Sequence, residues 1–162
     1  GLFNILNQLT NLSVFVSNGL NEGYLKRFLS FKKITISNTN DFIKYITINN
    51  FIIIIPLVLL SIIYFVFSSS YSYGINILPF YIVIMFIGPF KTIYFNVIIF
   101  YQQSKVIFVC STVYYVLNII SAYLSYRFLG LNGMILSLSI ALCLYIFVLK
   151  MLSTRIMFKN DQ

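Results

Sequence analysis

The sequence predicts an all-α membrane protein, a polytopic bundle of transmembrane helices. Only 9% of its 162 residues are charged and 60% are hydrophobic, whereas soluble domains average about 25% charged residues. No acidic residue occurs between Asp41 and Asp161. A soluble domain needs a polar exterior, but a bilayer favours an apolar exterior with every backbone group bonded within a helix. We therefore expect a multi-pass membrane protein with about five spans.

The first expected span covers residues 1–20 and carries a polar stripe. Amide side chains recur there at helical spacing, at Asn4, Asn7, Gln8, Asn11 and Asn18. Because an amide that faces lipid is unfavourable, the stripe should face other helices or a water-filled cavity. Asn11 and Asn18 are thus candidates for lining a polar path, and amide bonds between packed helices are an equally open interpretation.

Residues 21–50 form an expected polar connection. It has two acidic residues, Glu22 and Asp41, and five cations, which are Lys26, Arg27, Lys32, Lys33 and Lys44. The residues Thr39, Asn40 and Asp41 are good helix caps ahead of Phe42. We expect a helix to start near Asp41 and to continue into the membrane.

Four further apolar runs are expected to span the bilayer, at residues 51–68, 76–101, 106–126 and 134–152. Their lengths match the ~20 residues that cross a ~30 Å hydrocarbon core. Pro56 should kink the first of these runs, because neighbouring helices can satisfy the carbonyl that it frees. Gly88-Pro89 interrupts the second run about midway. Short turns are expected between the runs, and a tail follows them, at 69–75, 102–105, 127–133 and 153–162.

The distribution of cations predicts the orientation. The connection 21–50, the turn 102–105 and the segment from Lys150 to the end of the tail carry nine of the 11 cations, and they share one side. The loop 69–75 and the turn 127–133 share the other side and carry only Arg127. Since cytoplasmic loops are rich in lysine and arginine, we expect the first side, including the tail 153–162, to be cytoplasmic.

Lys91 is the strongest candidate for a functional residue. It lies roughly 15 Å from the end of its expected span, close to the bilayer midplane. No expected span contains a carboxylate that could pair with it. An intramembrane cation needs a water-filled cavity, a partner elsewhere in the protein or an anionic ligand. The alternative is a shifted helix that brings Lys91 nearer the interface.

Other polar residues are weaker candidates for a substrate path. Lys26 could guide an anionic headgroup, although contact with membrane lipids and a topological role are simpler explanations. Asn96 and Asn118 could line a polar path, but bonding between helices explains each equally well. The sequence has no histidine, acid pair, nucleophile triad, phosphate loop or metal cluster. We therefore expect no enzyme activity, cofactor or metal, and the lack of a basic stripe with aromatics argues against nucleic acid.

Two short motifs resemble those of Wzx-type flippases. The stretch Gly19–Lys26, GLNEGYLK, resembles their Gly-x-x-x-Gly-x-x-Lys element after the second span. The stretch from Lys105 to Ser153 is similar to their fifth and sixth spans, and SYRFLGLNG at 125–133 looks like their Tyr-Arg-x-x-Gly-x-x-Gly connection. These proteins form the polysaccharide transporter family of the multidrug/oligosaccharidyl-lipid/polysaccharide exporter superfamily. Lys26 matches the family lysine, whereas Lys91 matches no family motif.

The resemblance implies both an architecture and a function. The family fold has two six-helix lobes around a cavity, and this chain would supply spans two to six of the first lobe. Since the chain begins at Gly1 rather than Met, we expect a fragment that works with a missing C-terminal lobe. The implied activity is translocation of undecaprenyl-diphosphate-linked O-antigen or polysaccharide repeat units across the bacterial inner membrane by alternating access.

Other functions stay open at this point. A drug or small-molecule exporter of the same superfamily fits the same fold, since fold does not fix function. An enzyme of polysaccharide assembly, or a structural membrane subunit, is a further alternative. The polysaccharide polymerase is also a possible partner of the implied flippase.

Overall fold

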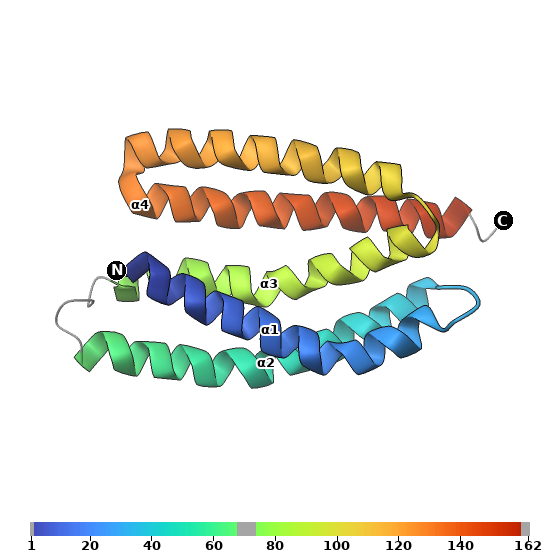
Figure 1. The fold of residues 1–162 in the computed structure, drawn as a ribbon, viewed down its shortest axis with the longest axis horizontal. Helices are drawn as coiled ribbons and strands as arrows, with labels where there is room; N and C mark the ends of the chain where they lie inside the picture. Colours follow the sequence, from blue (N-terminus) through green and yellow to red (C-terminus); the bar gives the residue numbers. More distant parts are fainter. Residues whose placement is uncertain (1, 68–73, 160–162) are drawn as a thin grey trace.

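The computed structural model describes residues 2–67 and 74–159, and every regular element within those ranges is helical (Figure 1). The elements are α1 (Leu2–Leu29), α2 (Ile36–Phe67), α3 (Gly74–Phe100) and α4 (Ser104–Lys159). The expected loop at 69–75 lies almost entirely outside the described residues. The all-helical fold class is confirmed for the part of the chain that the structure describes.

Helix α4 folds back on itself at Gly130. This residue has φ 63° and ψ −151° in the middle of otherwise helical backbone, a conformation that is essentially restricted to glycine. Gly133 is also constrained, because a Cβ there would lie 2.6 Å from the carbonyl oxygen of Ser125. The two limbs, residues 104–129 and 131–159, therefore run side by side as a hairpin (Figure 1). We call them the first and second limbs of α4.

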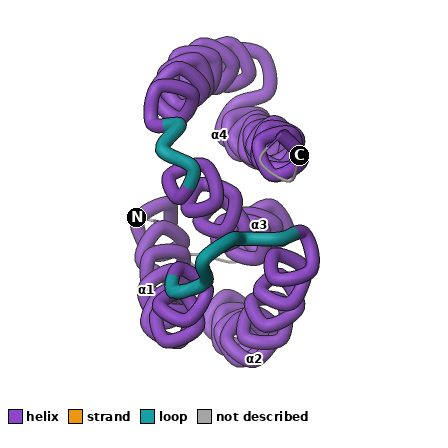
Figure 2. The backbone as a smooth tube through the Cα atoms, turned by 90° about the vertical axis from the view of Figure 1, so that its right-hand side faces the viewer, coloured by secondary structure: helices purple, strands orange, loops and turns teal. Residues whose placement is uncertain are grey.

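The helices are arranged around α3. Figures 1 and 2 both show the α4 hairpin on one side of α3, with α1 and α2 on the other side. The structure has three buried apolar clusters, and α3 contributes to each of them, for example with Met85, Val97 and Ile98. Among the described helices, α3 is the one on which α4 packs extensively. The central helix thus joins two groups of helices.

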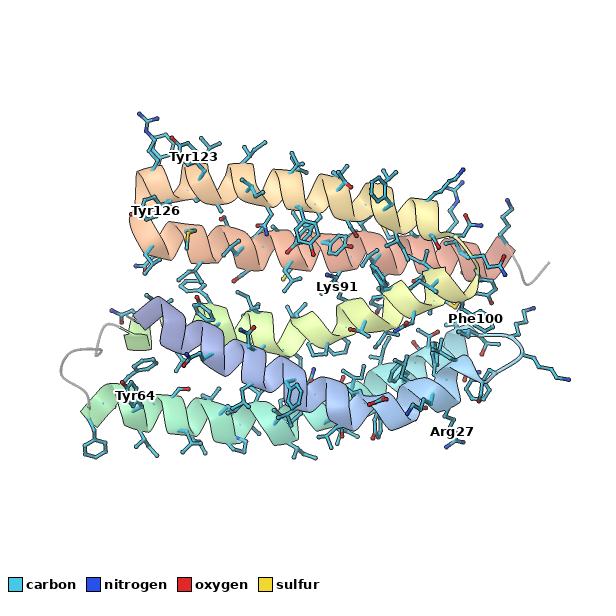
Figure 3. All side chains as sticks on the ribbon, in the orientation of Figure 1. Arg27, Tyr64, Lys91, Phe100, Tyr123 and Tyr126 are labelled. Atoms are coloured by element: carbon cyan, nitrogen blue, oxygen red, sulfur yellow. The ribbon has the colours of Figure 1, made fainter. Side chains whose placement is uncertain are left out.

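Three helices are long and apolar enough to cross a membrane: α2, α3 from Asn76 onward, and α4. Their outward side chains are largely apolar, and Ile119 and Phe128 expose 71% and 79% of their surface. Exposed tyrosines Tyr64, Tyr123 and Tyr126 lie at one end of the bundle (Figure 3). Aromatic side chains of this kind are enriched at membrane–water interfaces.

Most cations gather at the opposite end, where Figure 3 places Arg27 and Phe100. There the Tyr101 hydroxyl donates a 2.9 Å hydrogen bond to the carbonyl of Ile34, which joins the loop after α1 to the turn after α3. The end of α4 reaches the same region, since Met157 belongs to the buried cluster that contains Phe28. We call this the cationic end, and its cations are Lys26, Arg27, Lys32, Lys33, Lys105, Arg155 and Lys159.

The polar connection is shorter than expected. α1 continues to Leu29 and α2 starts at Ile36, so that only residues 30–35 of the expected 21–50 stretch lie outside a helix. The α2 cap is Thr35, whose hydroxyl accepts a hydrogen bond from the backbone NH of Asn38 at 3.3 Å. Thr39, expected before a helix start, is already inside α2 and donates to the Thr35 carbonyl. An earlier capping residue therefore starts the helix, and the polar residues that follow lie on its surface.

Candidate functional site

Lys91 lies on α3, at the interface with the α4 hairpin. It is half-buried, and it is the one cation among the 11 of the sequence that is not exposed. Figure 3 places it well inside the bundle, away from both ends. Phe100 follows nine residues later, which corresponds to about 14 Å of helix. A lysine side chain cannot cover that distance to bulk water.

Two tyrosine rings contact the Lys91 ammonium. Its Nζ lies 5.5 Å from the ring centroid of Tyr145 and 5.9 Å from that of Tyr115. Tyr115 belongs to the first limb of α4 and Tyr145 to the second. Such cation–π contacts contribute about 0.5–2 kcal/mol each, depending on desolvation. The tyrosines thus stabilise a charge that forms no ion pair with a carboxylate of the described residues.

Polar groups extend the cluster along the first limb of α4. The Tyr145 hydroxyl and Ser111 Oγ are hydrogen-bonded at 2.7 Å. The ring of Tyr114 stacks on Tyr145 with centroids 4.3 Å apart, and Asn118 Nδ2 donates to the Tyr114 hydroxyl at 3.4 Å. Asn118 Oδ1 is buried without a hydrogen-bond partner. A buried acceptor without a donor is costly, so this oxygen can receive a donor from a ligand.

Of the five predicted site residues whose side chains the structure describes, only two are brought together. Lys91 and Asn118 are connected through Tyr145 and Tyr114. Asn96 instead donates to the carbonyl of Thr92 in its own helix at 2.8 Å.

The other predicted residues lie apart from this cluster. Lys26 is at the cationic end, pairs with Glu22 at 3.0 Å and has a side chain that is 76% exposed. Asn11 is exposed on α1, so its side chain joins no buried network. The side chain of Asn18 lies outside the described residues.

A second polar cluster joins α1, α2 and α3. Asn50 is only 1% exposed. Its Oδ1 accepts a 3.0 Å bond from Ser17, and its Nδ2 donates to the Phe86 carbonyl at 3.0 Å. Asn21 donates to Ser17 and accepts from Asn49. The bond to the Phe86 carbonyl lies about one turn before Pro89, so Asn50 ties α1 and α2 to α3 where proline interrupts the backbone bonding of that helix.

A hollow of about 460 Å³ lies between these three helices. Polar groups of Asn21, Glu22 and Thr92 line it together with Pro89. Thr92 follows Lys91 directly on α3, and successive residues of a helix point in different directions. The hollow and the tyrosine cluster therefore lie on different faces of α3.

Sequence reasoning missed the tyrosines and the Asn50 cluster. Ser111, Tyr114, Tyr115 and Asn118 recur at spacings of three and four along one limb, which is the signature of a polar helix face. Asn118 alone was singled out, because a tyrosine in an apolar run is easily counted as core. The Tyr145 contact could not be found this way, since it depends on how the two limbs pair.

Comparison with known proteins identifies no relative: no protein-family model, curated protein or solved structure matches the chain.

Proposed function

We propose that this chain is part of a flippase for lipid-linked oligosaccharides in the bacterial inner membrane, with Lys91 binding the substrate diphosphate. The observation that carries the proposal is the position of Lys91, a half-buried cation on a helix long and apolar enough to cross a membrane. Such a charge is costly unless it serves a ligand or a pathway. A diphosphate has the opposite charge and the hydrogen-bond acceptors that an ammonium needs.

The tyrosine contacts of Lys91 are weak enough for an anionic ligand to replace them. A cation–π contact is worth only about 0.5–2 kcal/mol, whereas a charge-assisted hydrogen bond to an anion is about twice as strong as a neutral one. The Lys91 ammonium therefore contacts Tyr115 and Tyr145 when no ligand is bound, and it binds a diphosphate instead when one is present. Asn118 Oδ1, which lacks a donor, would accept a bond from a sugar hydroxyl of the same substrate.

The proposed architecture has five spans. α2, α3 and each limb of α4 are long enough to cross, since about 20 residues suffice. α1 is 28 residues long, and its buried Ser17 and Asn21 face α2 rather than lipid. We place the cationic end in the cytoplasm, following the bias of cytoplasmic loops towards lysine and arginine. In this orientation the Gly130 turn and the exposed tyrosines face the periplasm.

Genetic complementation tests the function. The full-length protein, expressed in a strain that lacks its own O-antigen flippase but makes a substrate of matching repeat unit, should restore surface polysaccharide. A drug exporter of the same superfamily would instead change the susceptibility of the strain to toxic compounds and leave its surface unchanged. That second outcome, with the protein present in the membrane, would overturn the proposed substrate.

A further inference from the structure

A long apolar groove lies between the two limbs of α4. It has about 560 Å³ of space. The first limb lines it from Val109 to Leu124 and the second limb from Ser137 to Val148. The first of these stretches corresponds to about 22 Å of helix, which exceeds the ~15 Å of one bilayer leaflet. The groove is thus long enough to receive a hydrocarbon chain that enters from one leaflet.

The polar groups of the groove wall are already bonded within the protein. Ser121 donates to the carbonyl of Asn118, and Ser137 donates to that of Met134. The hydroxyl of Tyr145 is bonded to Ser111, and that of Tyr114 to Asn118. The groove therefore offers an occupant an apolar surface, since its polar atoms need no further partner. A hydrocarbon chain satisfies that surface better than a polar ligand does.

Cations flank one end of the groove. On the second limb, Arg155 follows the groove-lining Val148 by seven residues, two turns that return to the same helix face. On the first limb, Lys105 precedes Val109 by one turn. Both side chains are exposed, and no carboxylate of the described residues pairs with either. Their neighbours Val106 and Ile156 pack in one cluster, so the two cations lie at the same end.

We propose that this groove binds an anionic phospholipid, with an acyl chain between the limbs of α4 and the phosphate at Lys105 and Arg155. A long apolar surface and two exposed cations at one end match the acyl chain and the phosphate of such a lipid. This binding uses cations other than Lys91, although Tyr114 and Tyr145 belong both to the groove wall and to the Lys91 cluster.

A single tryptophan reports the occupant, because the chain contains no natural one. The full chain carrying Leu117→Trp, whose side chain would lie in the groove, is placed in zwitterionic vesicles with a minor fraction of brominated lipid. We expect brominated phosphatidylglycerol to quench the groove tryptophan more than the same fraction of brominated phosphatidylcholine. The preference for phosphatidylglycerol should correspond to a roughly fivefold enrichment of this lipid at the groove for each of the two cations. Lys105→Gln with Arg155→Gln should abolish it.

Two controls separate the groove from the general lipid surface. Ile119→Trp lies on the outer face of the same limb, with 71% of Ile119 exposed, and should be quenched equally by the two lipids. Lys150→Gln removes a cation near the same end but on the opposite face of the second limb from the groove, and should leave the Leu117→Trp preference intact. Equal quenching of Leu117→Trp by both lipids overturns the proposal. Absence of quenching by either lipid also overturns it, since it means that protein covers the groove.

Discussion

The ammonium of Lys91 lies 5.5 Å from the ring centroid of Tyr145, across the interface between α3 and the second limb of α4. The contact joins the central helix to the hairpin that packs on it. Because α4 packs extensively on α3 alone, whatever weakens this contact acts on the main attachment of the hairpin. A ligand that draws Lys91 away from the tyrosines would therefore change how the hairpin is held, which is the kind of coupling that alternating access requires.

A double-mutant cycle measures the Lys91–Tyr145 contact. Tyr145→Leu removes the ring and Lys91→Met removes the charge at similar length. We expect a coupling of about 0.5–2 kcal/mol in the free energy of unfolding in detergent, because this is the range of a cation–π pair. Tyr145→Phe keeps a ring and should retain most of the coupling although it loses the bond to Ser111. Strictly additive single effects would mean that the contact carries no energy.

Asn50 is expected to stabilise the packing of α1, α2 and α3. Asn50→Leu removes the bonds to Ser17 and to the Phe86 carbonyl, and it should lower the free energy of unfolding by about 1–2 kcal/mol. The measurement is the thermal unfolding midpoint of the purified protein. Asn11→Leu, at an exposed position of α1, should leave the midpoint unchanged. Equal midpoints for the two variants would contradict the role of the Asn50 cluster.

Gly130 should be required for the α4 hairpin. Gly130→Ala forces a side chain into a backbone conformation that costs about 1–3 kcal/mol, although no neighbouring atom is within 4 Å of the new Cβ. Gly23→Ala is the matched control, because that glycine is helical and has equal space around it. The control should be neutral or slightly stabilising. If the two variants have the same free energy of unfolding, the backbone conformation of Gly130 does not fix the turn.

The topology predicts opposite labelling of the two ends of the bundle. Single cysteines replace Ser104 at the cationic end and Phe128 beside the Gly130 turn, in a background without Cys110 and Cys143. An impermeant thiol reagent applied to intact spheroplasts should label Phe128→Cys and spare Ser104→Cys, since we place the cationic end in the cytoplasm. Both should react after the membrane is permeabilised. The reverse pattern in intact cells would invert the proposed orientation.

The helical fold was predictable because apolar composition and length constrain a membrane chain strongly. The break at Gly130 was also foreseeable, since its segment contains two glycines and an asparagine. The start of α2 was not, because Thr35 and Thr39 are both good caps and only tertiary packing decides between them. Thr39 is 3% exposed and contacts Met157 at the far end of the chain, and no local pattern predicts that contact.

The candidate site was predictable only in part. Lys91 stands out by its charge in an apolar run, and this signal requires no knowledge of packing. Its tyrosine partners lie 24 and 54 residues further along the chain, on two limbs whose pairing the sequence does not specify. Conversely, Asn96 donates to a backbone carbonyl of its own helix, whereas Asn118 donates to the hydroxyl of Tyr114, a ring of the tyrosine cluster. Residue type alone could not separate it from Asn118.

The charge of Lys91 is the most direct test of the proposed function. Lys91→Arg, Lys91→Ala and Lys91→Glu are compared in the full-length protein by surface polysaccharide in the complemented flippase-null strain, with membrane protein levels checked by immunoblot. Lys44→Glu, which reverses an exposed cation of α2, is the matched control and should support normal export. We predict partial activity for Lys91→Arg, because the charge stays but its shape changes, severe loss for Lys91→Ala and the greatest loss for Lys91→Glu. Normal polysaccharide from Lys91→Glu at normal protein level would contradict a diphosphate site at Lys91.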